Sequence, residues 1–178
     1  MLTLSPHSET EPEFSERQQA VLDAALQLMV EEGDALTMNA VAARASCSKE
    51  TLYKWFGDRD GLLAATVQFQ ASKVKVDLPA TAEPDIQQLS VSLEQFAINW
   101  LTVLTGDTSI ALIGTAISHA RASKSDLGTV VLQFGRFAMG RRILPLLEIG
   151  RERNLLVFED GEECFRTFFG LVVRDIQI

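Results

Sequence analysis

The segment 37–56 constrains the fold of this chain more than any other. It predicts two short helices joined by the tight turn Ser46-Cys47-Ser48, with Thr37 as the N-cap of the first helix and Ser48 as the N-cap of the second. Two helices in this arrangement form a helix-turn-helix, whose second helix lies in the major groove of DNA. This second helix carries side chains suited to phosphates and base edges, namely Lys49, Thr51, Tyr53 and Lys54.

The segments on either side of this motif also have helical periodicity. A helix is expected over 16–32, between Ser15 as N-cap and Gly33 as C-terminal stop. A long fourth helix is expected to begin after the N-cap Asp58 and to reach about Val76. A Pro-containing linker follows over 77–84, and then come four apolar helical stripes, within 86–104, 110–117, 127–153 and 165–176.

No segment of the chain shows sustained strand-like alternation, so the predicted fold is all-α. Pro145 is expected to kink or split the helix that contains it. The periodic segment at the end of the chain stops at Ile178 without a Gly, Pro or polar tail. This ending predicts either a short protein or a truncated sequence.

The charge distribution favours a small DNA-reading surface on an otherwise acidic protein. The net charge of −8 argues against nonspecific coating of nucleic acid. Within 36–59 the bases Arg44, Lys49, Lys54 and Arg59 outnumber the two acids. The isolated residues Cys47 and Cys164, a polar N-terminus and the lack of an apolar run of about 20 residues predict a cytoplasmic protein with no membrane association.

An enzyme is not expected. The two histidines are His7, in the N-terminal tail, and His119, and no nucleophile elbow, phosphate loop or metal motif is present. The sequence therefore predicts no catalytic residue, no cofactor and no metal. The alternative function is a helical protein-interaction module with an architectural helix-turn-helix. The polar, basic face of the second helix argues against it, because a protein-binding face would carry more exposed apolar groups.

The segment 48–63, Ser-Lys-Glu-Thr-Leu-Tyr-Lys-Trp-Phe-Gly-Asp-Arg-Asp-Gly-Leu-Leu, resembles the tetracycline-repressor (TetR/AcrR) family of transcriptional regulators. The resemblance covers about residues 14–74, and the later helices loosely resemble the AefR-like variety of the C-terminal domain. It implies a ligand-responsive repressor that binds a palindromic double-stranded operator as a homodimer. The last two helices of the family pair with a second subunit as a four-helix bundle. The implied organisation is a disordered tail over 1–13, a DNA-binding domain over 14–74 and a ligand-binding and dimerisation domain over 75–178.

The resemblance also assigns DNA contact to residues in and beside the second helix. Tyr53 is expected to bind the DNA backbone through its hydroxyl, although a packing role fits it too. Lys49 and Asn39 match positions that contact bases or phosphates, and both side chains can read base edges. Arg59, after the Asp58 cap, is expected to clamp a phosphate. The complete expected set is Thr37, Asn39, Ser48, Lys49, Thr51, Tyr53, Lys54, Trp55 and Arg59.

In the C-terminal part, aromatic residues and one histidine are candidates to line a pocket for a small-molecule effector that is partly apolar. An ordinary hydrophobic core is the alternative, and an aromatic stripe at helical spacing more often belongs to a core than to a pocket. The candidates are Phe96, Trp100, His119, Phe134 and Phe137.

Two positions depart from the family pattern in the turn of the motif. Ser46 stands where the family usually has Gly, and a left-handed backbone there would favour Gly. Cys47 stands where the family usually has Val, and it is expected to pack as a small hydrophobic residue.

Overall fold

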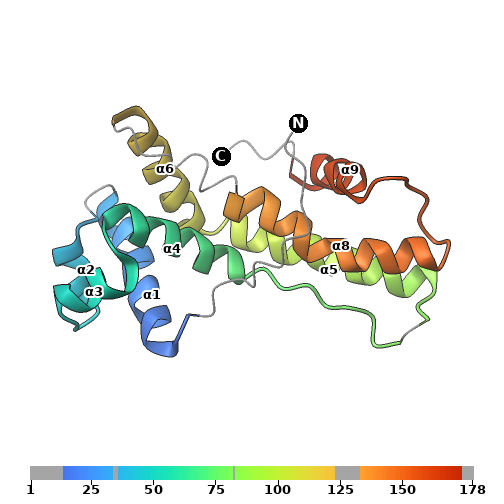
Figure 1. Cartoon of the computed structure of the whole chain (residues 1–178). Coiled ribbons are helices and arrows are strands. Elements are labelled where there is room, and N and C mark those ends of the chain that lie inside the picture. The colour runs from blue at the N-terminus through green and yellow to red at the C-terminus, as the bar shows by residue number, and fades with distance from the viewer. Residues whose placement is uncertain (1–13, 34–35, 82, 123–132, 174–178) are drawn as a thin grey trace.

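A computed structural model describes residues 14–33, 36–81, 83–122 and 133–173, except for the side chains of 116–122 and 133–134. Every regular element in these ranges is a helix, as predicted. The elements are α1 (Glu16–Glu32), α2 (Met38–Arg44), α3 (Lys49–Phe56), α4 (Arg59–Ser72), α5 (Ile86–Leu104), α6 (Asp107–Ala122), η2 (Gln133–Phe137), α8 (Ala138–Glu152) and α9 (Gly161–Val173). The molecule is elongated, with α2 and α3 at one end and α8 and α9 towards the other (Figure 1).

The first four helices begin where the sequence predicts, because each has a polar N-cap. Ser15 forms a capping box with Gln18, and the Asp58 carboxylate accepts a hydrogen bond from the Gly61 amide at 2.8 Å. The C-terminal stop of α1 is Gly33, with φ +63°.

The fourth helix is shorter than predicted. It ends at Ser72 instead of Val76, and its last turn tightens through bonds from the Lys73 amide to the Gln70 carbonyl at 3.2 Å and from the Val74 amide to the Ala71 carbonyl at 3.2 Å. Val74 is then buried in the core of the second half of the molecule. Burial of Val74 in this core therefore outweighs continuation of the helix.

Helix α8 runs through Pro145 as one continuous element, so the predicted split there is wrong. Pro145 is exposed, while its neighbours Ile143, Leu146 and Leu147 are buried. A proline inside a helix costs about 3 kcal/mol or more. The burial of these three side chains offsets this cost, because burying each one stabilises the fold by roughly 1.5–3 kcal/mol.

Two hydrophobic cores lie along the molecule. The first is mostly aliphatic and is formed mainly by residues of the four helices α1, α2, α3 and α4, together with Leu112 of α6. The second joins α5, α8 and α9 around Phe96, Trp100 and Phe165. The two cores meet at the end of α4, where Phe69 belongs to the first and Val74 to the second. Helix α4 is therefore one physical link between the two ends of the molecule, and α6, which packs on α1 and α5, is another.

Among the described helices, none is long and apolar enough by itself to cross a membrane. Helix α5 and residues 107–115 of α6 meet the same criterion of length and composition only when taken as a pair, and this pair is bent by 61°.

Candidate nucleic-acid interface and ligand pocket

The turn between α2 and α3 has the left-handed residue that a helix-turn-helix requires. Ser46 has φ +50°, a conformation that Gly adopts without strain and Ser does not. The next amide, that of Cys47, closes the turn by donating to the Ala42 carbonyl at 3.0 Å. Cys47 packs against the first core, as expected for a small hydrophobic residue.

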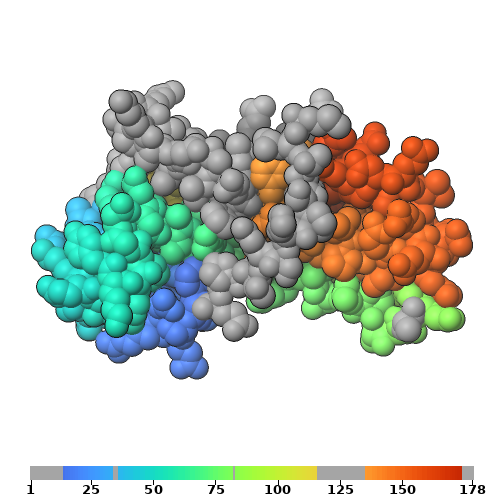
Figure 2. All heavy atoms as spheres, viewed as in Figure 1, coloured from blue at the N-terminus to red at the C-terminus, as the bar shows by residue number. Residues whose placement is uncertain are grey.

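Helix α3 has one face in the core and one face in solvent. Leu52 and Phe56 are buried, which fixes the orientation of the helix on α1, α2 and α4. Tyr53 is 52% exposed, and Lys49 and Lys54 are also exposed. In the part of the chain that the structure describes, neither lysine forms an ion pair. Figure 2 shows this end of the molecule with the side chains of α2 and α3 on its surface.

Two hydroxyl-bearing candidates cap the helices of the motif. The Thr37 Oγ1 accepts a hydrogen bond from the Ala40 amide at 3.1 Å. The Ser48 Oγ accepts one from the Thr51 amide at 3.1 Å and lies 3.1 Å from the Thr51 Oγ1. Both caps direct the N-termini of their helices towards solvent, where an anionic group could approach.

An acidic residue, Glu50, lies among the basic and polar groups of α3. Hydrogen bonds from its own backbone amide and then from the Ser48 hydroxyl hold the pKa of the Glu50 carboxyl below its ordinary value. This carboxylate is therefore ionised at neutral pH. It repels phosphate, so it restricts how α3 can approach the DNA backbone.

Two arginines of the basic segment make bonds within the protein. The Arg44 guanidinium bonds both carboxylate oxygens of Glu31, at 2.5 Å and 3.1 Å, and joins α2 to α1. Its hydrogen bond lowers the pKa of the Glu31 carboxyl. The Arg59 Nε donates to the Leu36 carbonyl at 2.7 Å and is partly buried. Arg59 thus ties the start of α4 to the segment before α2, a role that sequence reasoning did not identify.

The connection between α3 and α4 is tight enough to fix the position of α3, the second or recognition helix of the motif, on α4. A Cβ atom added at Gly61 would lie 1.9 Å from the Phe56 carbonyl oxygen, so only Gly fits there without a backbone shift. Gly57, with φ +77°, ends α3, and Asp58 caps α4 directly afterwards. A displacement of α4 would therefore carry α3 with it.

A pocket lies at the other end of α4, between α4, α5, α6 and the η2–α8 segment. Its volume is about 100 Å³. The apolar residues that line this α4–α8 pocket are Val67, Ala71, Val74, Trp100, Val103, Leu104, Leu112, Ile113 and Met139, and the remaining described ones are Gln70, Ser109 and Gly135.

The structure places the predicted effector-binding residues in different surroundings. Trp100 lines the α4–α8 pocket. Phe96 is 1% exposed and packs against Trp100 and Phe168, with ring centroids 5.9 Å and 6.0 Å away. Phe137 is partly buried at the start of α8, outside the described lining. The side chains of His119 and Phe134 lie outside the described part of the structure.

The part of the pocket lining in and directly after α4 was not predicted from the sequence. Val67, Ala71 and Val74 repeat at helical spacing, as core residues do, and nothing in their types distinguishes a pocket from a core. Gln70, between them, is the one available signal, because a polar side chain on an apolar face is uncommon.

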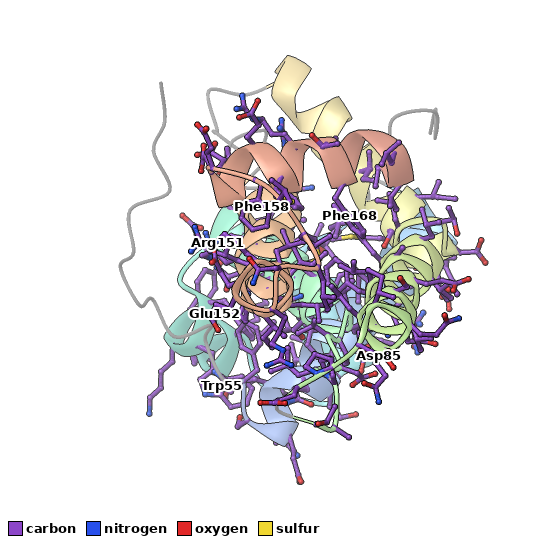
Figure 3. All side chains as sticks on the ribbon, turned by 90° about the vertical axis from the view of Figure 1, so that its right-hand side faces the viewer. Trp55, Asp85, Arg151, Glu152, Phe158 and Phe168 are labelled. Carbon is purple, nitrogen blue, oxygen red and sulfur yellow. The ribbon has the colours of Figure 1, made fainter. Side chains whose placement is uncertain are left out.

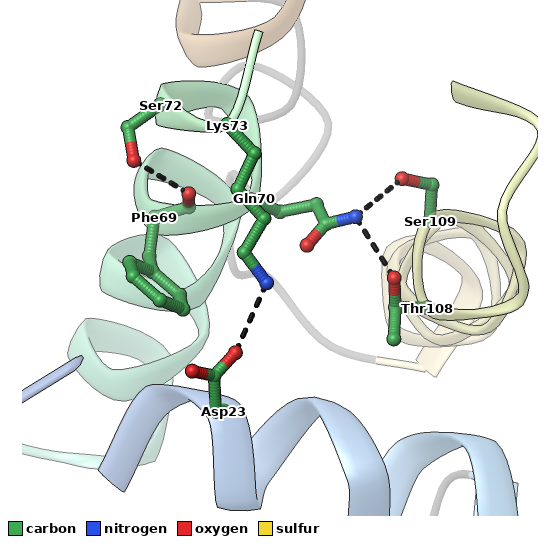
Figure 4. A network of polar contacts seen from close by, with 7 residues as sticks. All are labelled: Asp23, Phe69, Gln70, Ser72, Lys73, Thr108 and Ser109. Atoms are coloured by element: carbon green, nitrogen blue, oxygen red, sulfur yellow. Dashed lines mark hydrogen bonds and ion pairs between the residues drawn. The ribbon is translucent and has the colours of Figure 1, made fainter. Parts of the chain in front are cut away.

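The last turn of α4 forms polar bonds to three other helices. The Gln70 Nε2 donates to the Thr108 Oγ1 at 2.8 Å and the Ser109 Oγ at 3.0 Å in α6, and the Lys73 Nζ bonds the Asp23 Oδ1 in α1 at 3.0 Å (Figure 4). The Arg142 Nη1 in α8 donates to the Ala71 carbonyl, and to the Val74 carbonyl at 3.3 Å. These contacts, which we call the α4 joint, connect the surroundings of the pocket to α4 and α1 of the helix-turn-helix end.

Helix α9 packs on α5 and α8 through aromatic residues. Phe168 lies on the side of α9 that faces these helices, and Phe158, in the α8–α9 loop, lies between α8 and α9 (Figure 3). A second hollow, of about 470 Å³, lies between the C-terminal half of α8, the loop and α9. Leu171 on α9 and Val157 in the loop line this hollow and are largely exposed.

No group of three or more His, Cys, Asp or Glu that could hold a metal ion occurs among the described residues. Burial, and then the nearby Glu148 carboxylate, raise the pKa of the Cys164 thiol, so this thiol stays protonated near neutral pH.

The capped helices α2 and α3, joined by a tight turn and with the exposed polar face of α3, have the arrangement of the helix-turn-helix class of DNA-binding proteins. The family described as "Bacterial regulatory proteins, tetR family" matches residues 21–66. A TetR transcriptional regulator from Agrobacterium tumefaciens, known from its crystal structure, has 50% sequence identity to this chain. The match covers 92% of this chain and 81% of the Agrobacterium chain, with a TM-score of 0.78. The chain therefore belongs to the TetR family of DNA-binding transcriptional regulators.

Two further relatives are more distant. The flavonoid-responsive regulator FrrA is 29% identical over 87% of this chain and 78% of its own, with a TM-score of 0.62. The uncharacterized HTH-type transcriptional regulator YdeS from Bacillus subtilis strain 168 is 32% identical over 97 residues. That stretch is 53% of this chain and 47% of YdeS, so the match spans about half of the curated relative.

Proposed function

We propose that this TetR-family regulator is a repressor that binds a palindromic operator as a homodimer and leaves it when a small molecule fills the α4–α8 pocket. The observation that carries this proposal is the position of α4. Its first turn holds the recognition helix, through the Phe56–Gly61 approach. Its last turn lines the pocket through Ala71, and Val74, just after the helix ends, lines it too. The protein-interaction alternative has no support of this kind.

For DNA contact, we propose that α3 enters the major groove with Tyr53, Lys49 and Lys54 towards the duplex. Their exposure supports this, and each lysine would neutralise a phosphate or pair with guanine. Asn39 is exposed on α2 and would reach a base edge or the backbone. Thr37, Ser48, Thr51 and Trp55 would approach the sugar-phosphate backbone at the helix ends and edges.

Arg59 needs a narrower role than the resemblance implies. Its Nε bonds the Leu36 carbonyl, so we propose that Arg59 positions the start of α4 beside the DNA backbone by tying it to the segment before α2. The Asp58-capped N-terminus of α4 adds the positive end of a helix dipole at the same point.

Release from DNA would pass through the α4 joint. An occupant of the pocket would press on Ala71 and Val74, whose carbonyls Arg142 holds, and so displace α4 and the recognition helix attached to it. Such a shift requires the effector to bind the DNA-competent and released conformations with different affinities. FrrA, a relative with the same fold, is flavonoid-responsive, which supports a small-molecule response here.

Dimerisation is proposed through α8 and α9. Leu171 on α9 and Val157 in the α8–α9 loop are largely exposed apolar side chains, of the kind that a subunit interface covers. Two subunits would place their recognition helices in successive major grooves, about 34–36 Å apart. We also propose the domains 14–74 and 75–178, since the two cores divide near Val74, and a cytoplasmic location for an operator-binding protein.

The proposal is tested by footprinting the protein on the DNA upstream of its own gene at two salt concentrations, beside Tyr53→Ala. We expect protection of a near-palindromic site that weakens with salt and is lost in the variant. Protection by Tyr53→Ala equal to that by the wild type would overturn the assigned DNA contact. Sizing the protein in solution and on the protected site measures its stoichiometry, and one subunit per site would overturn the dimer.

A further inference from the structure

The polar groups of the α4–α8 pocket are already bonded to each other, which limits what the pocket can recognise. Gln70 and Ser109 are the two polar side chains in its described lining. The Ser109 hydroxyl has a single proton, and it donates this proton to the Val103 carbonyl at 2.6 Å. The Ser109 oxygen can therefore only accept a further bond, and it accepts one from the Gln70 Nε2.

This bond fixes the orientation of the Gln70 amide. One Nε2 proton goes to Ser109 and the other to the Thr108 Oγ1, so the amide has no donor left for an occupant of the pocket. The Gln70 Oε1 has no partner among the described residues, but this oxygen is itself enclosed by protein atoms. The described side chains of the lining thus offer an occupant no free donor and no accessible acceptor.

The described lining also contains no charged side chain. A charged group placed there would lose its hydration without gaining an ion-pair partner, which costs several kcal/mol in practice. A purely apolar occupant loses nothing of this kind, because dispersion contacts with residues such as Trp100, Leu104 and Met139 replace its contact with water.

The size of the pocket sets the second limit. Its volume of about 100 Å³ is below the roughly 300–1,000 Å³ of pockets that enclose drug-sized ligands. It is closer to an engineered apolar cavity of about 150 Å³ that takes up benzene.

We propose that the effector of this regulator is a small, uncharged, apolar molecule, of the size of one aromatic ring or a short hydrocarbon chain. The inference rests on the proposed function, in that it assigns the ligand class of the pocket through which the response would pass. Hydrophobic burial alone would hold such a ligand, with selectivity coming from the exclusion of charge and of bulk.

Trp100 allows a test that needs neither the operator nor the natural effector. In a Trp55→Phe background Trp100 is the single tryptophan, so its fluorescence reports on the pocket. The probes are toluene, benzoate and benzylamine, which share one ring and differ in charge, and flavone, which is uncharged but larger. We expect toluene to change the emission and raise the melting temperature, with an affinity about tenfold or more above that of either charged probe or of flavone.

Filling the pocket provides the matched control. Ala71→Leu should abolish the toluene response, while Ala97→Leu, on α5 outside the described lining, should keep it. If Ala71→Leu does not fold, Ala71→Val, which adds less volume, should still weaken toluene binding severalfold. A toluene response that survives filling of the pocket would overturn the assigned site.

The other outcomes separate this inference from the proposed function. Equal binding of benzoate or benzylamine would overturn the exclusion of charge, tighter binding of flavone would overturn the size, and no response to any probe would overturn the ligand class. Toluene binding that leaves operator affinity unchanged would instead keep the ligand class and contradict the ligand-responsive function.

Discussion

The helix-turn-helix unit and the α5–α9 half both consist of amphipathic helices, yet they hold their candidate functional groups in opposite places. In the first, the core is aliphatic and the groups proposed to contact DNA, such as Tyr53 and Lys49, point into solvent. In the second, the core contains an aromatic cluster of Phe96, Trp100 and Phe165, and the pocket is lined by the same residue types as the core. Functional side chains can thus be recognised from sequence only where packing does not select the same residue types.

The largest effect expected from this comparison is at Phe96, which the sequence left between core and pocket. Phe96→Ala should lower the free energy of unfolding by about 3–5 kcal/mol, because Phe96 is fully buried against Trp100 and Phe168. Denaturant unfolding measures the loss. Ile98→Ala, on the exposed face of the same helix, is the control and should change stability by less than about 1 kcal/mol. A stable Phe96→Ala protein that no longer responds to its effector would place Phe96 in the pocket instead.

The α4 joint gives the next largest effect, since it connects the two regions. Arg142→Met removes a cationic donor from the Ala71 and Val74 carbonyls and should cost about 1.5–3 kcal/mol. It should also weaken the effect of a pocket ligand on operator affinity more than it weakens either binding event alone. The control is Arg141→Met at the exposed neighbouring position on α8. It should leave unchanged both the stability and the effect of a pocket ligand on operator affinity. Equal behaviour of the two variants would contradict transmission through this joint.

The sequence predicted the first four helices and their N-caps, apart from the end of α4. Ser15, Thr37, Ser48 and Asp58 cap the helices as expected, because a cap depends on residues within one turn. The end of α4 was predicted four residues too late, since burial of Val74 in the second core decides it. The pocket lining on α4 and the Arg142 bonds were not predicted either, because tertiary packing brings together residues far apart in the sequence, 38 positions for Gln70 and Thr108 and 71 for Arg142 and Ala71.

A third effect, at the reading surface, should appear in binding and not in stability. Tyr53→Phe removes only the hydroxyl and should weaken operator binding about tenfold, the value of one hydrogen bond to a phosphate. Because Tyr53 is half exposed, the free energy of unfolding should change by less than about 0.5 kcal/mol. The slope of log affinity against log salt concentration should be unchanged in Tyr53→Phe. In Lys49→Met the magnitude of this slope should fall by about one. Unaltered affinity in Tyr53→Phe would assign the contribution of this residue to its ring.

The smallest effect has the opposite sign and lies in the turn of the helix-turn-helix, where this chain departs from its family. Ser46 adopts φ +50°, which costs a non-glycine residue about 1–2 kcal/mol, whereas glycine loses about 0.5–1 kcal/mol more backbone entropy on folding. Ser46→Gly should therefore raise the free energy of unfolding by about 0.5–1 kcal/mol, measured by thermal and denaturant unfolding. Ser46→Ala keeps the left-handed strain and should give no gain. A lower stability of Ser46→Gly would mean that the Ser46 hydroxyl stabilises the turn by more than the left-handed backbone costs. Serine would then fit this position because its hydroxyl forms bonds there, and not merely because it is small.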